Sequence, residues 1–267
     1  MDIPDEDLED MVVDLPPYID ATKYPGGLLL SDADLLLINH YLPLEAGYCL
    51  NSEGMYYVST SVVMPRVTGT MIEWWFGYVT TTQQFKQWHP KDHEYSEWYG
   101  LHGNSTYIGG HHLVREWIGD ELHHFRFSFK HPREYFDSTW RRNFQRNGYA
   151  TAICARLGIW GGPGFEAAEM GHVIHLVKNE FQGVRMRSRF WLGDVPGIEV
   201  ADIRARIVSP SLAAGLGRHC AEEMTFLAGF LPELYERENP RPERGKGSSW
   251  LETVVDDRPR PTGERRR

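Results

Sequence analysis

The longest helical pattern of the chain carries a histidine and a glutamate at metal-ligand spacing. Residues 211–236 predict a helix, and four positions separate His219 from Glu223, which places both side chains on one helical face. On a helical wheel both lie beside or within the apolar stripe, whereas Glu222 points away. A buried, ionised glutamate needs a cation, a strong hydrogen-bond partner or a proton. The pair could therefore bind a metal ion or form a buried hydrogen bond.

Two other stretches offer further ligands for such a site. In the strand-like segment 111–118 alternate residues share a face, so Glu116 can point inward only if Arg115 points outward. His93 follows a short helical pattern, and its neighbour Asp92 could orient the chain there. Two imidazoles and two carboxylates would neutralise a divalent cation. This donor set suits zinc, and iron or manganese are chemically admissible.

Composition and periodicity predict the elements that must position these residues. Residues 54–67 favour a strand, and 71–79 and 80–89 have the length of two short helices, the second with threonines able to cap it. Residues 132–147 favour a helical insertion, and Pro232 should kink the last turn of the final helix or end it early. Five further segments have strand character, several with period-two alternation: 111–118, 121–129, 148–159, 171–181 and 183–193.

This order of elements predicts an α+β fold of the helix-grip (birch-pollen-allergen-like) type, with a curved antiparallel sheet around a long C-terminal helix and a cavity between them. We divide the chain into an acidic N-terminal extension (1–50), a catalytic helix-grip domain (51–236) and a mostly extended tail (237–267). The extension should pack against the domain and contain one helix near 33–40. The glycine-rich segment 159–171 is interpreted as a mobile lip over the cavity.

The overall composition excludes several classes of function. The 267 residues fit one large domain with appendages, and 13% aromatic residues favour a cavity for planar or hydrophobic ligands. A net charge of −9 argues against nucleic acid as a partner. The three cysteines are far apart, which fits a reducing compartment. The start of the chain has no basic, apolar leader, so we expect a cytoplasmic protein without a membrane partner. The sequence leaves a homodimer open.

Five segments, in order over residues 70–230, resemble the family of 2,4-diacetylphloroglucinol and phloretin hydrolases. They are IEWWFG (72–77), FKQWHPKDH (85–93), HHLVREWIG (111–119), RMRSRFWLGD (185–194) and HCAEE (219–223). The resemblance implies a helix-grip fold with an N-terminal extension, and hydrolysis of a carbon–carbon bond between an aromatic ring and an acyl group. It also implies a zinc ion, whose ligands map by motif onto four residues: His93, Glu116, His219 and Glu223.

The same resemblance implies a substrate-side histidine, which falls on His175. At two positions, Phe85 and Phe190, this chain departs from the tyrosines that we expect to anchor a phenolic substrate in the family. Each phenylalanine removes a hydroxyl from the expected pocket, so a polyhydroxylated aryl ketone need not be the natural ligand. A less polar acyl arene, or another compound like a 1,3-dicarbonyl, becomes the alternative substrate.

The predicted function is therefore a zinc-dependent hydrolase acting on a small aromatic or polyketide-like ketone. Zinc lowers the pKa of bound water from about 15.7 towards about 7 and polarises a carbonyl. The carbon leaving group must be protonated, and His175 is the candidate for that step, with Glu223 or Glu116 handling the water proton. Two alternatives stay open: a non-hydrolytic cyclase or isomerase of natural-product biosynthesis that uses the same cavity, and a hydrophobic small-molecule carrier.

Overall fold

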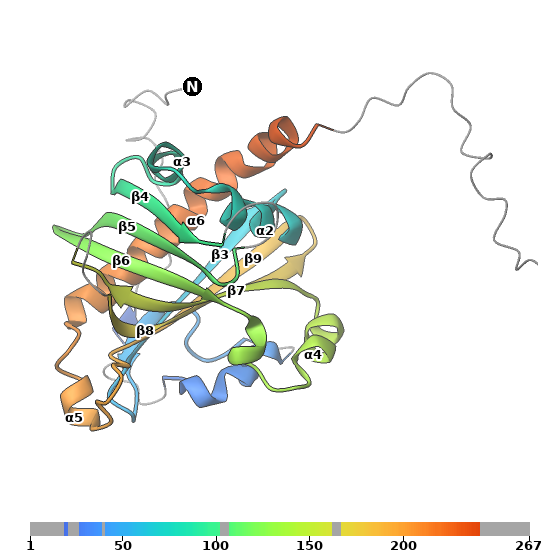
Figure 1. Ribbon diagram of the computed structural model, residues 1–267. Coiled ribbons are helices and arrows are strands. Elements are labelled where there is room, and N and C mark those ends of the chain that lie inside the picture. Colours follow the sequence, from blue (N-terminus) through green and yellow to red (C-terminus); the bar gives the residue numbers. More distant parts are fainter. Residues whose placement is uncertain (1–18, 21–26, 39–40, 102–106, 162–166, 241–267) are drawn as a thin grey trace, which may run out of the picture.

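The computed structural model describes residues 19–20, 27–38, 41–101, 107–161 and 167–240, in which nine strands form one strongly curved sheet (Figure 1). The strand order is β1-β2-β3-β9-β8-β7-β6-β5-β4, and only the two-residue pairing of β1 with β2 is parallel. The strands are β1 Ile19–Asp20, β2 Gly47–Leu50, β3 Tyr56–Pro65, β4 His93–Gly100, β5 Gly110–Ile118, β6 Glu121–Lys130, β7 Tyr149–Ile159, β8 Ala168–Glu180 and β9 Gly183–Leu192.

Helices lie on both faces of this sheet (Figure 1). The long helix α6 packs along the concave face together with α2 and α3, while η2 and α4 pack on the opposite face. The helical elements are η2 Leu30–Leu37, α2 Gly69–Tyr78, α3 Thr82–Trp88, η3 Pro132–Glu134, α4 Trp140–Asn147, α5 Ala201–Arg204 and α6 Pro210–Glu238. Within the described ranges, no helix is both long enough and apolar enough to cross a bilayer.

The concave face holds the larger hydrophobic core. One stripe of α6 is buried there, including Leu216, Cys220, Met224 and Leu227, as its amphipathic pattern predicts. Strand residues that point inward complete this core with aromatic and β-branched side chains. The outer face carries a second core, in which η2 and α4 cover the central strands. Because both faces are covered, β7 and β9 are buried almost continuously.

The predicted α+β helix-grip architecture is confirmed, with the sheet curved around α6. Strand β4 was not expected from the sequence, and the short N-terminal helix is a 3-10 helix at Leu30–Leu37. Pro232 does not end α6 early, since the helix continues to Glu238 with Leu234 buried beyond the proline.

The division of the chain into extension, domain and tail stays a prediction. The lip expected around the glycines of 159–171 falls partly on 162–166, and the tail beyond 240 falls on 241–267. Both of these segments lie outside the described residues.

Candidate metal centre

Four side chains from three elements converge at one end of the cavity between α6 and the sheet. His93 begins β4, Glu116 is its cross-strand partner in β5, and His219 and Glu223 lie one turn apart on α6. All four are at least nine-tenths buried. His93 Nε2 lies 3.2 Å from His219 Nε2, 3.4 Å from Glu116 Oε2 and 3.7 Å from Glu223 Oε2. His219 Nε2 lies 3.5 Å from Glu116 Oε2. The structure thus brings together the four residues that the sequence singled out.

Short-range interactions fix these side chains in place. The capping box of Thr81 and Gln84 starts α3, and the Trp88 indole at its end donates to the backbone carbonyl of Glu223 in α6. The Phe85 carbonyl accepts a hydrogen bond of 2.8 Å from His93 Nδ1. This bond places the proton of a neutral His93 on Nδ1, so its Nε2 presents a lone pair to the cluster.

Without a metal, the cluster balances its two glutamates with protons on its own side chains. Burial would lower the pKa of His219, but its bonds with Asp92 and Glu116 outweigh that effect and raise the pKa to about 10. Burial and the positive charge of His219 hold the pKa of His93 well below its usual range. Burial and the neighbouring Glu116 raise the pKa of Glu223 to about 8. In the metal-free chain a proton on His219 therefore partly substitutes for a cation.

The donor set and its spacing fit zinc. Ligands at 2.0–2.1 Å around a tetrahedral zinc ion are separated from one another by about 3.3 Å. The four distances between ligand atoms given above run from 3.2 to 3.7 Å. Two imidazoles and two carboxylates are also nitrogen and oxygen ligands of the kind that zinc binds, and they would neutralise its charge. His93, Glu116, His219 and Glu223 could therefore hold a zinc ion.

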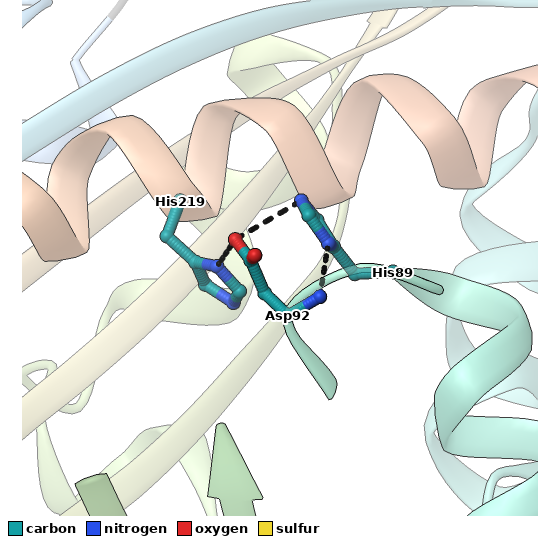
Figure 2. A group of neighbouring side chains, drawn as sticks. All are labelled: His89, Asp92 and His219. Carbon is teal, nitrogen blue, oxygen red and sulfur yellow. Dashed lines mark hydrogen bonds and ion pairs between the residues drawn. The ribbon is translucent and has the colours of Figure 1, made fainter. Parts of the chain in front are cut away.

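A second layer of polar groups supports His219. Its Nδ1 donates to Asp92 Oδ2 at 3.3 Å, which leaves Nε2 for the cluster. His89 lies on the far side of Asp92, and its ring stacks on His219 with 4.9 Å between the ring centroids (Figure 2). Sequence reasoning gave Asp92 only a general orienting role and missed His89. The available signal was spacing, because His89, Asp92 and His93 lie within five residues of one another.

Three of the four ligand residues, Glu116, His219 and Glu223, line a largely aromatic cavity. The space between its wall atoms is about 540 Å³, of which about 40 Å³ is open to the centres of water molecules. Both Phe85 and Phe190 line the cavity, as does His175. The other lining residues are Phe76, Trp88, His112, Val114, Phe127, Phe129, Ile153, Ala155, Val173 and Leu216.

Beyond Glu116, His219 and Glu223, this lining contains two ionisable side chains, both histidines. His112 Nε2 lies 2.5 Å from Ser96 Oγ, so that atom is already engaged. His175 Nδ1 lies 2.8 Å from Ser188 Oγ on the neighbouring strand, which leaves the opposite ring nitrogen for a ligand. Burial lowers the pKa of each histidine to about 3, so both rings are neutral. Sequence reasoning identified His175 but not its partner Ser188.

Comparisons with known proteins match most of the chain. The profile of the family described as DAPG hydrolase PhiG domain matches residues 28–236. Phloretin hydrolase from Eubacterium ramulus is 30% identical over 206 residues, which cover 72% of each chain. The 2,4-diacetylphloroglucinol hydrolase of Pseudomonas protegens is 24% identical over 252 residues, which cover 82% of this chain and 76% of that protein.

Solved structures with a similar arrangement are distant. Protein Ms6760 from Mycobacterium smegmatis has a TM-score of 0.42 at 10% identity, and it covers 68% of this chain and 93% of its own. Ara h 8.0201 has a TM-score of 0.41 at 9% identity, with 67% and 99% covered.

Proposed function

The chain belongs to the DAPG hydrolase PhiG domain family, and we propose that it is a zinc-dependent hydrolase that cleaves a carbon–carbon bond between an aromatic or enolisable carbon and an acyl group. The main support is the convergence of four side chains at tetrahedral spacing beside an aromatic cavity: His93, Glu116, His219 and Glu223. The names of the relatives, phloretin hydrolase and 2,4-diacetylphloroglucinol hydrolase, favour an aryl ketone as the substrate.

The net reaction adds water across the scissile bond. The acyl carbon gains a hydroxyl to become a carboxylic acid, and the aromatic or enol carbon gains a hydrogen. Zinc, when bound, would polarise the acyl carbonyl and lower the pKa of a bound water towards about 7. The aromatic walls would exclude bulk water and hold the planar substrate.

In this proposal His175 manages the proton of the leaving carbon. Its ring is neutral and held by Ser188, so the other nitrogen can accept a proton from a hydroxyl or enol of the substrate. His175 then delivers the same proton to the substrate carbon that has lost its acyl group, which completes the release of the arene. Glu223 or Glu116, the two carboxylates that line the cavity, would take the proton of the attacking water.

The decisive experiment combines metal analysis with product analysis. Purified protein is assayed for zinc and incubated with a panel of aryl ketones and 1,3-diketones, and the products are identified by mass spectrometry. We expect about one zinc per chain, and carboxylic acid and deacylated arene in equal amounts. A rearranged product without acid would indicate a cyclase or isomerase, and metal-free protein that binds these compounds unchanged would indicate a carrier. Either result would reject the proposal.

The role of His175 is tested separately from the metal. His175→Ala should keep its zinc and lose about 10²–10⁴-fold in turnover, the usual contribution of a general acid or base. His112→Ala is the matched control, since that histidine lines the same cavity but is engaged by Ser96. An unchanged turnover in His175→Ala would make His175 a structural residue of the sheet.

A further inference from the structure

His89 is a buried histidine next to the candidate metal centre with no part in its ligand set. Its side chain is only 3% exposed, and its Nε2 lies 3.6 Å from Asp92 Oδ2 and 3.7 Å from Glu222 Oε2. Among the described residues this nitrogen has no hydrogen bond of standard geometry. It is therefore a buried polar atom directed at two carboxylates, one of which also contacts His219.

The backbone determines which nitrogen of His89 carries the proton. The Asp92 N–H donates to His89 Nδ1 at 3.2 Å, so Nδ1 must present a lone pair. In a neutral ring the hydrogen is then on Nε2, where it points towards the carboxylates of Asp92 and Glu222. A nitrogen that carries a hydrogen cannot bind a metal ion. A metal ion at His89 Nε2 would have to displace that proton while Nδ1 still accepts the Asp92 N–H, so the spacing of His89, Asp92 and His219 does not favour a second metal site.

His89 and His219 approach the same carboxylate oxygen. His219 Nδ1 lies 3.3 Å from Asp92 Oδ2 and His89 Nε2 lies 3.6 Å from it, and Figure 2 shows the carboxylate between the two rings. Whatever holds this carboxylate in place also fixes the ring plane of His219 and the hydrogen on its Nδ1. The lone pair of His219 Nε2 is thereby directed at the metal centre.

We propose that His89 is a positioning residue that holds the Asp92 carboxylate against His219 and so strengthens zinc binding, with Glu222 as a second acceptor for its N–H. This inference rests on the proposed zinc site. It also gives a role to Glu222, which the helical wheel places away from the cavity.

Packing must be separated from hydrogen bonding in any test. The His89 ring stacks on His219 and meets Phe226 edge to face, with 4.9 Å between centroids in both pairs. His89→Phe keeps an aromatic ring for these contacts and removes the N–H. His89→Gln gives up the ring and keeps a side-chain N–H donor. His89→Phe therefore tests the loss of the N–H donor, and His89→Gln tests the loss of the aromatic ring.

The experiment measures the zinc dissociation constant by competition with a chromophoric chelator, which needs no substrate. His89→Phe should weaken zinc binding by about 10–100-fold, the usual effect of losing a group that supports a ligand, and His89→Gln should recover most of that loss. In an Asp92→Asn background His89→Phe should add little, because His89 acts through that carboxylate. His111→Phe is the control and should bind zinc normally, because His111 lies on the face of β5 opposite to Glu116.

Three results would overturn this inference while leaving the proposed function intact. One is normal zinc affinity in His89→Phe, and another is an additive loss in the double variant. The third is a second zinc equivalent that is lost on substitution of His89. Failure of the parent protein to bind zinc at all would instead reject the proposed function.

Discussion

Two clusters of buried charge lie on opposite faces of the same sheet, and they differ in what holds their carboxylates. On the outer face Glu45 accepts bonds of 2.6–3.0 Å from Arg187 and Arg189 of β9. Burial opposes ionisation there, but the two guanidinium groups outweigh it and lower the pKa of Glu45. On the concave face, burial and Glu116 raise the pKa of Glu223.

The difference shows that burial of charge does not by itself mark a functional site. The outer cluster also binds the N-terminal region to the sheet, because Arg187 donates to the Leu36 carbonyl and to the Tyr149 hydroxyl. Its charges are paired within the protein, which is how a structural ion pair behaves. In the inner cluster the ligand atoms converge on one another, and protons on His219 and Glu223 take the place of a metal cation in the metal-free chain. We therefore expect inner substitutions to change function and outer ones to change stability.

The largest expected effect comes from removing one inner ligand. His219→Ala should abolish zinc binding and reduce turnover by more than about 10³-fold, because the metal supplies both carbonyl polarisation and the activated water. Elemental analysis and product assays on the same preparation check both effects. A variant that keeps its zinc would place the metal elsewhere.

The outer cluster should respond in the opposite way. Glu45→Gln leaves two buried guanidinium groups without a carboxylate, which should cost about 3–5 kcal/mol of folding free energy. For a domain of this size that corresponds to roughly 6–20 °C in Tm. Zinc content and turnover per folded molecule should not change. Loss of zinc with unchanged stability would contradict the expected difference between the outer and inner clusters.

A matched control for Glu45 lies nearby on the same face. Glu180 pairs with Arg185 at 2.6 Å, but about a quarter of each side chain is exposed. Glu180→Gln should therefore cost no more than about 1 kcal/mol, as for other pairs near the surface. Equal losses of folding free energy in Glu45→Gln and Glu180→Gln would show that burial is not what makes the Glu45 cluster important for stability.

The pH dependence of stability should distinguish metal-free from zinc-loaded protein. Glu223 and His219 have pKa values near 8 and 10, above their usual 4.5 and 6.5, so the folded metal-free chain holds more protons than the unfolded one. Stability then falls as pH rises, first through 4.5–8 from Glu223 and then through 6.5–10 from His219. Zinc displaces these protons, so its affinity should rise over the same range. Urea unfolding at several pH values, with and without zinc, measures both trends.

The sequence could predict much of the inner cluster, because local periodicity determines where those side chains point. Four positions along a helix placed His219 and Glu223 together, and strand alternation placed Glu116 inward, as its 4% exposure shows. Strand β4 escaped prediction because the irregularity between His93 and Tyr95 breaks its alternation. Its burial pattern is therefore irregular, which removes the period-two signal.

Groups that meet only through tertiary contacts were not predictable. His89 acquires its partners through the turn before β4 and through Glu222, which lies more than a hundred residues away. Glu45 and the arginines of β9 are separated by a similar length of chain. Pro232 failed as a helix terminator because Leu231 and Leu234 are buried on either side of it, and this packing maintains the helix beyond the proline.

The smallest expected effect concerns the cavity wall next to the metal centre. Phe85 stacks on His93 with 3.6 Å between centroids, and Phe190 meets His175 edge to face at 6.0 Å. Neither side chain offers a hydroxyl. A bound substrate ring with several phenolic hydroxyls would therefore lose its hydrogen bonds to water without gaining hydrogen bonds to these two residues. We expect 2,4-diacetylphloroglucinol to be a poor substrate, and Phe85→Tyr or Phe190→Tyr to improve it.

The size of this gain follows from hydrogen-bond energies. One bond contributes about 0.5–1.5 kcal/mol and relief of an unpaired buried hydroxyl about 1–3, so kcat/KM should rise a few-fold to tenfold or somewhat more. Acetate release at fixed zinc measures it, and Phe127→Tyr, elsewhere in the same lining, tests whether any added hydroxyl suffices. Rapid hydrolysis by the parent, or slower hydrolysis by both Tyr variants, would assign the chain to acylphloroglucinol substrates. A gain in kcat/KM confined to Phe85→Tyr and Phe190→Tyr would show that these two positions of the inner face determine substrate choice, while the metal-ligand residues of the same face supply the chemistry.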